Sequence, residues 1–324
     1  MKSETVDPVP STRCRRRWRW LGYLMIALLL MAGIVIGLFV EYMNAFFRGF
    51  EPAEMAAVHY RQKTLRANLG GMLVAIPWYF AEYVEYDGDP GFGEKRKGPR
   101  PVRTPESKVR SFGFDMRYPD MRGLETWAMR SERSRRYIPA NTPWISVGIT
   151  SGEDYPGDGF MDRRAYASLE AVPSNDHPMF LYSRLPNKQH GLEVYAQLTI
   201  DERTSRPYRE DSDAEDVFVY RDQDGHVKSY IRCSNRKYVP GTKRKLSAPP
   251  CGHEFSLEPR ADVEVYVHYR RQLLHQWQNI EMKVRQRILS FEILPGETES
   301  PASLEAERHR MEREKHQQQT QPAQ

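Results

Sequence analysis

The sequence lacks the short motifs that identify many enzymes and nucleotide-binding proteins. It has no G-x-S-x-G elbow, no H-E-x-x-H motif and no Walker A loop. The glycine-rich stretch GDPGFG resembles a phosphate loop, but no Gly-Lys-Ser/Thr follows it. His253 and His268 lie beside expected strands, where an acid/base pair is possible and a structural or surface histidine is the more common case. We therefore predict neither a catalytic residue nor a cofactor.

The chain also has little net charge outside its N-terminus. The whole sequence carries +5, and residues 1–20 contain six Lys/Arg and two Asp/Glu, so 6 − 2 = +4 belongs to this short segment and +1 to the rest. Proteins that bind phosphate backbones need a basic stripe or patch. Nucleic acid is therefore not an expected partner.

Charged residues are absent from one long apolar segment, residues 21–40. A helix needs ~20 apolar residues to cross a bilayer. Five arginines precede the segment and Glu41 follows it, which predicts a cytoplasmic N-terminus and an exported main domain. The alternative is a cleaved signal peptide, but the run exceeds the ~7–15 residues of a signal core and no small-x-small cleavage site follows.

Cysteine is scarce, with only Cys14, Cys233 and Cys251. Cys14 lies in the expected cytoplasmic tail, whereas Cys233 and Cys251 lie on the exported side, where disulfides persist. We predict that these two pair, closing a loop of 251 − 233 − 1 = 17 residues. The alternative is a metal site that includes His253, but it lacks the paired C-x-x-C spacing of zinc sites.

Hydrophobic periodicity predicts a mainly β domain with a C-terminal packing helix (α+β), preceded by one N-terminal transmembrane helix. Apolar and polar residues alternate along 112–118, and Asp224-Gly225 lies between two β-rich runs as in a tight hairpin. The apolar residues of 271–291 recur at helical spacing, with Glu281, Lys283, Arg285 and Arg287 on the opposite, solvated face. Further strands are expected at 72–77, 144–150, 179–185, 192–200, 217–221, 227–233, 253–259 and 261–270.

These patterns divide the chain into five parts. They are a basic cytoplasmic tail (1–20), a transmembrane helix (21–40), a juxtamembrane linker (41–70), an exported β-rich domain (71–294) and a disordered tail (295–324). The linker is expected to contain a short helix with Ala56, Leu65 and Leu69 facing inward, ending at Gly70 and Gly71. A coiled coil is the alternative for the tail, but it has few apolar seam residues.

Acidic, glycine-containing stretches recur at 85–95, 151–164, 209–216 and 221–226. Carboxylate and carbonyl oxygens are ligands that calcium prefers. None of the stretches has the EF-hand pattern, and Asp, Gly and Pro are also common turn residues. Calcium stays an alternative, and no metal ligand is predicted.

Two long loops mix aromatic residues with charges. Aromatic and arginine side chains are the usual anchors of protein interfaces. The loops therefore supply candidate contacts with a protein partner, namely Tyr86, Asp87, Asp89, Phe92, Tyr118, Arg122 and Trp127.

Four segments carry a resemblance to known proteins. Residues 70–99, 107–121, 214–236 and 249–280, read in order, resemble a group of poorly characterised bacterial membrane-anchored proteins associated with type VI secretion effector loci. The resemblance covers most of 70–291 and rests on overall sequence rather than on a catalytic signature.

The resemblance implies an immunity protein that is anchored by one helix in the bacterial inner membrane, with its main domain in the periplasm. Such a protein would bind a secreted, envelope-targeting toxin, such as a phospholipase, and occlude its active site. Two alternatives belong to other classes: a structural accessory subunit of a cell-envelope or secretion complex, and an envelope hydrolase.

Overall fold

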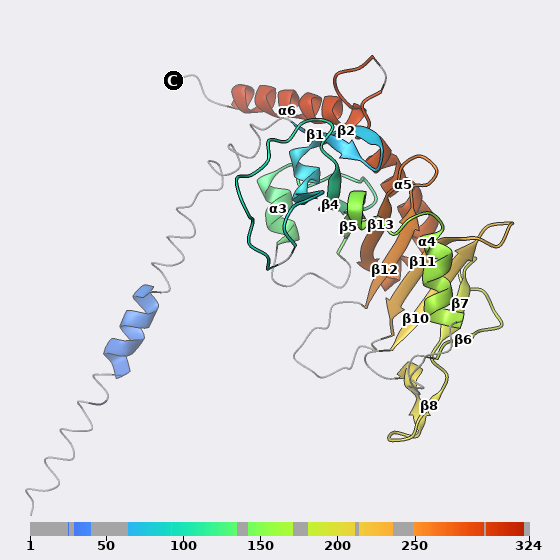
Figure 1. Ribbon diagram of the computed structural model, residues 1–324. Coiled ribbons are helices and arrows are strands. Elements are labelled where there is room, and N and C mark those ends of the chain that lie inside the picture. The colour runs from blue at the N-terminus through green and yellow to red at the C-terminus, as the bar shows by residue number, and fades with distance from the viewer. Residues whose placement is uncertain are drawn as a thin grey trace, which may run out of the picture. The chain divides into compact units, whose positions relative to one another are not determined.

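The computed structural model describes residues 25, 29–39, 64–91, 93–134, 142–170, 181–210, 214–235, 249–294 and 296–320 (Figure 1). The chain divides into two compact units, Met1–Ala57 and Val58–Gln324. In the first unit, Met25 and residues 29–39 are helical. Among the described residues, no helix combines the length and apolar character needed to span a membrane. The expected tail 1–20 and the remainder of the segment 21–40 lie outside the described residues.

One large sheet forms the centre of the second unit. Its order is β3-β4-β5-β13-β12-β11-β10-β7-β6, and all neighbours are antiparallel. The strands are β3 (Glu82–Tyr86), β4 (Val109–Arg117), β5 (Trp144–Thr150), β6 (Ser183–Arg184), β7 (Glu193–Ala196), β10 (Glu215–Arg221), β11 (Val227–Ser234), β12 (Pro250–Ser256) and β13 (Glu264–Arg270). The mainly β prediction is confirmed, and β3 and β6 are the two edges.

Alternation correctly predicted the central strands. Phe112, Phe114 and Met116 of β4 are buried on one face, and the expected hairpin around Gly225 is β10–β11. The predicted strand 192–200 is wrong beyond Ala196, because the chain leaves the sheet there. It continues into a small hairpin of β8 (Ile200–Asp201) and β9 (Arg206–Pro207). Of the predicted strand 179–185, the structure describes residues 181–185. Only Ser183 and Arg184 of these form a strand, β6.

The helix predicted over 271–291 packs on the face of the sheet that carries Phe112, Phe114 and Met116. Its start is a 3₁₀ turn, η6 (Arg271–Gln276), and α5 follows (Trp277–Leu289). Its buried residues, Leu274, Trp277, Ile280, Val284 and Ile288, join the main core with alternate residues of β4, β5, β13, β12 and β11.

The prediction that Glu281 and Arg287 are solvated was wrong. Their side chains are only 13% and 15% exposed. Glu281 lies at helical spacing between Trp277 and Val284, so it belongs to the stripe that faces the sheet.

Short helices cover parts of the other face of the sheet. Helix α4 (Phe160–Ala165), extended by a π turn, η3 (Tyr166–Glu170), packs over β10 and β11 and buries Phe160 and Met161 against Val217 and Val219 (Figure 1). Helix α3 (Trp127–Arg133) lies nearer β4 and β5, because Arg133 bonds to side chains of both. Further 3₁₀ turns are η1 (Trp78–Phe80), η2 (Gly152–Asp154) and η5 (Tyr208–Glu210).

The segment before Gly71 is a strand rather than the C-terminal half of a helix. β1 (Thr64–Leu69) pairs with β2 (Met72–Pro77), and Gly70 and Gly71 form the two-residue turn with φ of +55° and +93°. Two positive φ angles are what a type I′ hairpin turn requires, so the glycines that suggested a helix end make a hairpin. The folded unit therefore begins before residue 71, and residues 41–63 lie outside the described part.

The prediction of a disordered tail was also wrong over Pro301–Thr320, which forms helix α6. Its first turn docks on β2, where the hydroxyls of Ser300 and Ser303 both donate to the carbonyl of Ala75, at 2.6 and 3.0 Å. Ala302 is buried beside them. Composition suggested disorder because most of the segment is polar, and a few small residues at its start suffice to dock it.

Candidate functional site

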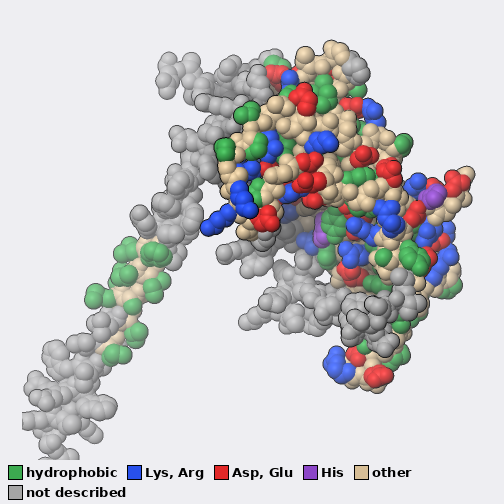
Figure 2. Space-filling view, viewed as in Figure 1, with side chains coloured by type: hydrophobic (Ala, Val, Ile, Leu, Met, Phe, Trp, Pro, Cys, Tyr) green, Lys and Arg blue, Asp and Glu red, His purple; other side chains and the backbone are tan. Residues whose placement is uncertain are grey.

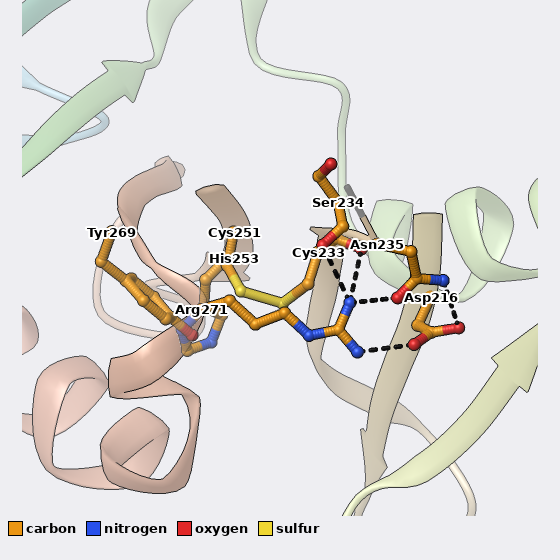
Figure 3. Close-up of a disulfide and its surroundings, with 8 residues drawn as sticks. All are labelled: Asp216, Cys233, Ser234, Asn235, Cys251, His253, Tyr269 and Arg271. Atoms are coloured by element: carbon orange, nitrogen blue, oxygen red, sulfur yellow. Dashed lines mark hydrogen bonds and ion pairs between the residues drawn. A yellow bond between two sulfur atoms is a disulfide. The ribbon is translucent and has the colours of Figure 1, made fainter. Parts of the chain in front are cut away.

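The predicted disulfide is confirmed. Cys233 and Cys251 are directly opposite in the β11–β12 ladder and are bonded to each other (Figure 3). Because both sulfurs are used, the alternative metal site with His253 is contradicted. Beside the disulfide, Arg271 donates to the carbonyl of Ser234 at 2.9 Å and to Asp216 at 2.6 Å.

Asp216 is the buried anion of this cluster. Burial by itself raises its pKa, but hydrogen bonds from Arg209, Asn235 and Arg271 outweigh burial and hold the pKa of Asp216 below its ordinary value. The disulfide and the Arg271–Asp216 pair together fasten the ends of β10, β11 and β12 to η6. This part of the molecule therefore has a structural role.

His253 lies in a second structural cluster, between α5 and the sheet. The ring is fully buried, and its Nε2 lies 3.2 Å from Glu281 Oε2 and its Nδ1 3.5 Å from the Tyr269 hydroxyl. Glu281 also accepts from Ser229 at 2.6 Å and from Arg285 at 2.9 Å. His268 is solvent-exposed, and its Nε2 lies 3.1 Å from the Tyr266 hydroxyl. The preference for structural and surface histidines therefore agrees with these contacts.

The predicted partner contacts fall into two groups at opposite ends of β4. Tyr86 pairs with Val109 at the first residue of the strand, whereas Tyr118 follows its last residue. Nine strand residues at ~3.3 Å each make eight steps, so about 26 Å of strand separates the groups. The two loops therefore do not form one surface patch. Phe92 and the side chain of Trp127 lie outside the description.

The Tyr118 group is committed to internal contacts. Asn279 of α5 donates to the Tyr118 hydroxyl at 2.7 Å, and the ammonium of Lys283 lies 5.7 Å from the ring centre. Arg122 pairs with buried Glu125 at 2.8 Å. The contacts of Tyr118 fasten the loop after β4 to α5, and the Arg122–Glu125 pair lies within this loop. Both side chains therefore have a structural explanation.

The Tyr86 group borders a cavity of about 480 Å³ beside the edge strand β3, which we call the β3 cavity. Tyr86 and Asp89 both line it, together with the apolar side chains of Leu65, Trp78 and Val84. Asp87 does not, because its carboxylate accepts from the backbone N–H of Glu153 at 3.0 Å. The structure thus unites two of the predicted contacts in one site.

Arginines of the loop after β3 supply the polar wall of the β3 cavity. Arg96 and Arg103 both donate to Asp89, and the guanidinium of Arg103 stacks 4.3 Å from the ring centre of Tyr86. Arg100 also lines the cavity. Residues 94–103 contain five Lys/Arg and one Glu, so 5 − 1 = +4 lies in ten residues.

The charge balance of this wall depends on Asp89. Burial raises the pKa of Asp89, but hydrogen bonds from Arg96 and from the backbone N–H of Tyr86 outweigh burial and lower it below the ordinary value. Asp89 is therefore ionised at neutral pH. One carboxylate binds two of the arginines but neutralises the charge of only one, so the loop as a whole stays cationic.

Tyr83 is the most exposed aromatic side chain at the β3 cavity, at 89%. It also has a left-handed backbone, with φ of +54°, at a bulge in β3 between Glu82 and Glu85. A bulky residue in this conformation is strained by ~1–3 kcal/mol, and such strain is concentrated at functional sites. The bulge turns an aromatic side chain outward from an edge strand, next to three arginines.

The sequence reasoning missed Tyr83, Trp78, Arg100 and Arg103. The signal that was available is the cationic run 95–103 that follows an aromatic strand. The conformation of Tyr83 had no signal, because Tyr is an ordinary strand residue.

Within the described residues, no group of three or more His, Cys, Asp or Glu side chains is arranged to hold a metal ion. Several carboxylates of the acidic stretches instead bind arginines. Arg110 pairs with Glu85 at 2.9 Å and Glu153 at 3.1 Å, and Arg209 pairs with Asp216 at 2.9 Å.

The β3 cavity is a concave, cationic and aromatic surface, suited to binding. Figure 2 shows Lys/Arg and Asp/Glu side chains interspersed over one face of the molecule.

No known protein family model and no curated protein matches this chain. Two solved structures are similar to it. One is Smlt3025, an immunity protein of the Stenotrophomonas maltophilia type IV secretion system, with 19% identity and a TM-score of 0.45, covering 72% of this chain and 94% of that chain. The other is FrpD, an iron-regulated outer membrane lipoprotein of Neisseria meningitidis, with 9% identity, a TM-score of 0.37 and coverage of 72% and 94%. A likeness at this level does not establish a shared function.

Proposed function

We propose that this protein is an immunity protein that binds a secreted effector through the β3 cavity and neutralises it by occlusion. The observation that carries the proposal is Tyr83, a strained and exposed tyrosine at the rim of an apolar cavity with an arginine wall. Tyr and Arg are enriched among the residues that dominate interface energies. Occlusion requires no catalytic residue and no cofactor of this chain.

The position of the cavity on an edge strand suits this role. The loop that carries the arginines is fixed at its base by Asp89 and by Arg110, whose guanidinium donates to the Asp89 carbonyl at 3.1 Å. A fixed loop loses little conformational entropy on binding. Its positive charge favours an acidic partner surface and accelerates encounter with it.

The location in the cell is part of the same proposal. A single inner-membrane helix at 21–40, a cytoplasmic N-terminus and a periplasmic main domain agree with the arginine asymmetry and with the disulfide, which needs an oxidising compartment. A tether would concentrate the inhibitor near the membrane that the toxin attacks. The sequence resemblance favours a type VI effector.

Affinity capture tests the proposal. The full chain is co-expressed with a catalytically disabled copy of the effector from its own locus, purified in detergent and titrated. We expect one-to-one binding that Tyr83→Gly weakens at least ~30-fold, the equivalent of a 2 kcal/mol hot spot. Gly suits a positive φ, so this variant should fold at least as well as the wild type.

Two control variants make the result specific. Tyr166→Ala removes an exposed tyrosine elsewhere, and Arg203→Gln removes an exposed arginine on the β8–β9 hairpin. Both should bind like the wild type, whereas Arg100→Gln should bind more weakly. Unchanged binding by Tyr83→Gly and Arg100→Gln would reject the β3 cavity as the contact site. Recovery of envelope-complex subunits without effector would favour the structural alternative instead.

A further inference from the structure

Two exposed histidines from distant parts of the chain lie next to each other, away from the residues that line the β3 cavity. His190 is in the turn between β6 and β7, and His275 is in η6, just before α5. Their ring centres are 6.2 Å apart. Within the described residues, neither ring has an ion pair, and only the ring of His275 has a hydrogen bond, to the carbonyl of Gln272.

A tight turn holds His190 in place. Gln189 and Leu192 exchange backbone hydrogen bonds of 3.0 and 2.9 Å. The two residues between them both have positive φ, +53° for His190 and +81° for Gly191, as in a type I′ turn, where Asn, Asp or Gly is the usual first residue. The Nε1 of Trp277 donates to the carbonyl of His190 at 3.0 Å. The turn that carries His190 is therefore fastened to the start of α5.

The hydrogen bond of His275 decides which of its nitrogens is able to bind a ligand. Its Nδ1 lies 2.9 Å from the carbonyl oxygen of Gln272, and a carbonyl only accepts, so Nδ1 carries the proton. In the neutral ring, Nε2 then has a free lone pair. Histidines that bind metals usually have this arrangement, in which the other nitrogen donates to a carbonyl or carboxylate and fixes the ring. The exposed ring of His190 is free to turn about χ2.

We propose that His190 and His275 together bind one divalent transition-metal ion of the Cu²⁺, Ni²⁺ or Zn²⁺ class. Metal–nitrogen distances of ~2.0–2.1 Å, together with the ring widths, allow two imidazoles on one ion to have centres up to ~6.4 Å apart, and 6.2 Å lies within this limit. Imidazole suits these ions, whereas Mg²⁺ and Ca²⁺ prefer oxygen.

The site is open, because the chain supplies two ligands and water supplies the others. The bound ion connects the β6–β7 turn to η6, two segments that are 85 residues apart in the chain (275 − 190 = 85). It should therefore stabilise the folded state by mass action. The site does not rest on the proposed immunity function.

Calorimetric titration of the full chain, in detergent and without a histidine tag, tests the site with Cu²⁺ and Zn²⁺. His190→Asn suits the positive φ of the turn and His275→Gln keeps a polar side chain, so both variants should fold. Each should weaken the tightest metal binding at least ~tenfold, because losing even the hydrogen-bond partner of a ligand costs ~10–100-fold. His226→Asn, at an exposed histidine elsewhere, should bind like the wild type.

Stoichiometry separates one shared ion from two independent histidines. A shared ion gives one tight equivalent that either variant weakens, with two nitrogens coupled to Cu²⁺ in the EPR spectrum of the wild type and fewer in each variant. Two equivalents, of which each variant removes one and leaves the other unchanged, would overturn the site. So would equal affinity of the wild type and His190→Asn. None of these measurements uses the effector, so their failure is separate from failure of the immunity proposal.

Discussion

Replacing Glu281 by Gln should cost this fold about 3 kcal/mol at neutral pH. Glu281 is a largely buried carboxylate between α5 and the sheet. Burial by itself raises its pKa, but contacts with His253, Arg285 and Ser229 outweigh burial and lower the pKa to about 2, from an ordinary value of 4.5. Gln keeps the shape and removes the charge. The side-chain NH₂ of Gln is a donor, and it would face Ser229 or Arg285, which now donate to the carboxylate of Glu281.

The magnitude follows from the linkage between protonation and folding. The difference of 4.5 − 2 = 2.5 corresponds to about 3 kcal/mol at ~1.36 kcal/mol per pKa unit. Because the folded-state pKa is depressed, the contribution is fully present above about pH 4.5 and is lost as the pH falls towards 2. Glu281→Gln should therefore lose stability at pH 7 and should show a weaker pH dependence than the wild type between pH 4.5 and 2.

Urea unfolding of residues 58–324 measures this, with tryptophan fluorescence as the signal, since Trp277 packs 6.0 Å from the His253 ring. The fragment contains every residue of the main core, from Ala67 to Ala302. Exposed Glu202→Gln is the matched control and should change stability by less than ~0.5 kcal/mol. A loss below 1 kcal/mol in Glu281→Gln, or a pH dependence like that of the wild type, would refute the reasoning.

Three further predictions concern the framework, each measured by urea unfolding of the same fragment. The double change of Cys233 and Cys251 to Ser should cost about 3 kcal/mol, because the disulfide closes a loop of 17 intervening residues, and the cost should match that of reducing the wild type. Gly70→Ala should cost more than ~1 kcal/mol, because φ is +55° and the added Cβ would lie 2.6 Å from the carbonyl oxygen of Asp262, whereas Gly71→Ala meets no atom within 4 Å and should cost less. Asp216→Asn should cost about 3 kcal/mol, because it leaves the half-buried Arg209 and Arg271 without their anion; a loss like that of a surface change would contradict the structural role of the cluster.

The candidate site was only partly predictable. Tyr86 and Asp89 were recognised because aromatic and charged residues alternate in a glycine-rich loop, and both line the β3 cavity. Tyr118 and Arg122 had the same composition, yet Tyr118 fastens its loop to α5 and Arg122 pairs with Glu125 inside that loop. Composition identifies residues that are able to anchor an interface, and only packing decides whether their polar groups are already used.

The sequence by itself determined the strands with clear alternation, the β10–β11 turn, the pairing of Cys233 with Cys251 and the amphipathic stripe of α5. The strands, the turn and the stripe depend on neighbours in the chain. The disulfide depends on there being only two cysteines after the apolar segment 21–40. Gly70-Gly71 is a local signal that fits both a helix end and a type I′ hairpin turn, and the pairing of β1 with β2 decided between them. Tertiary structure alone decided that Glu281 is buried against His253 and that α6 docks on β2. Local propensity is weak at these two positions, and the outcome depends on partners distant in the chain, His253 and Ala75.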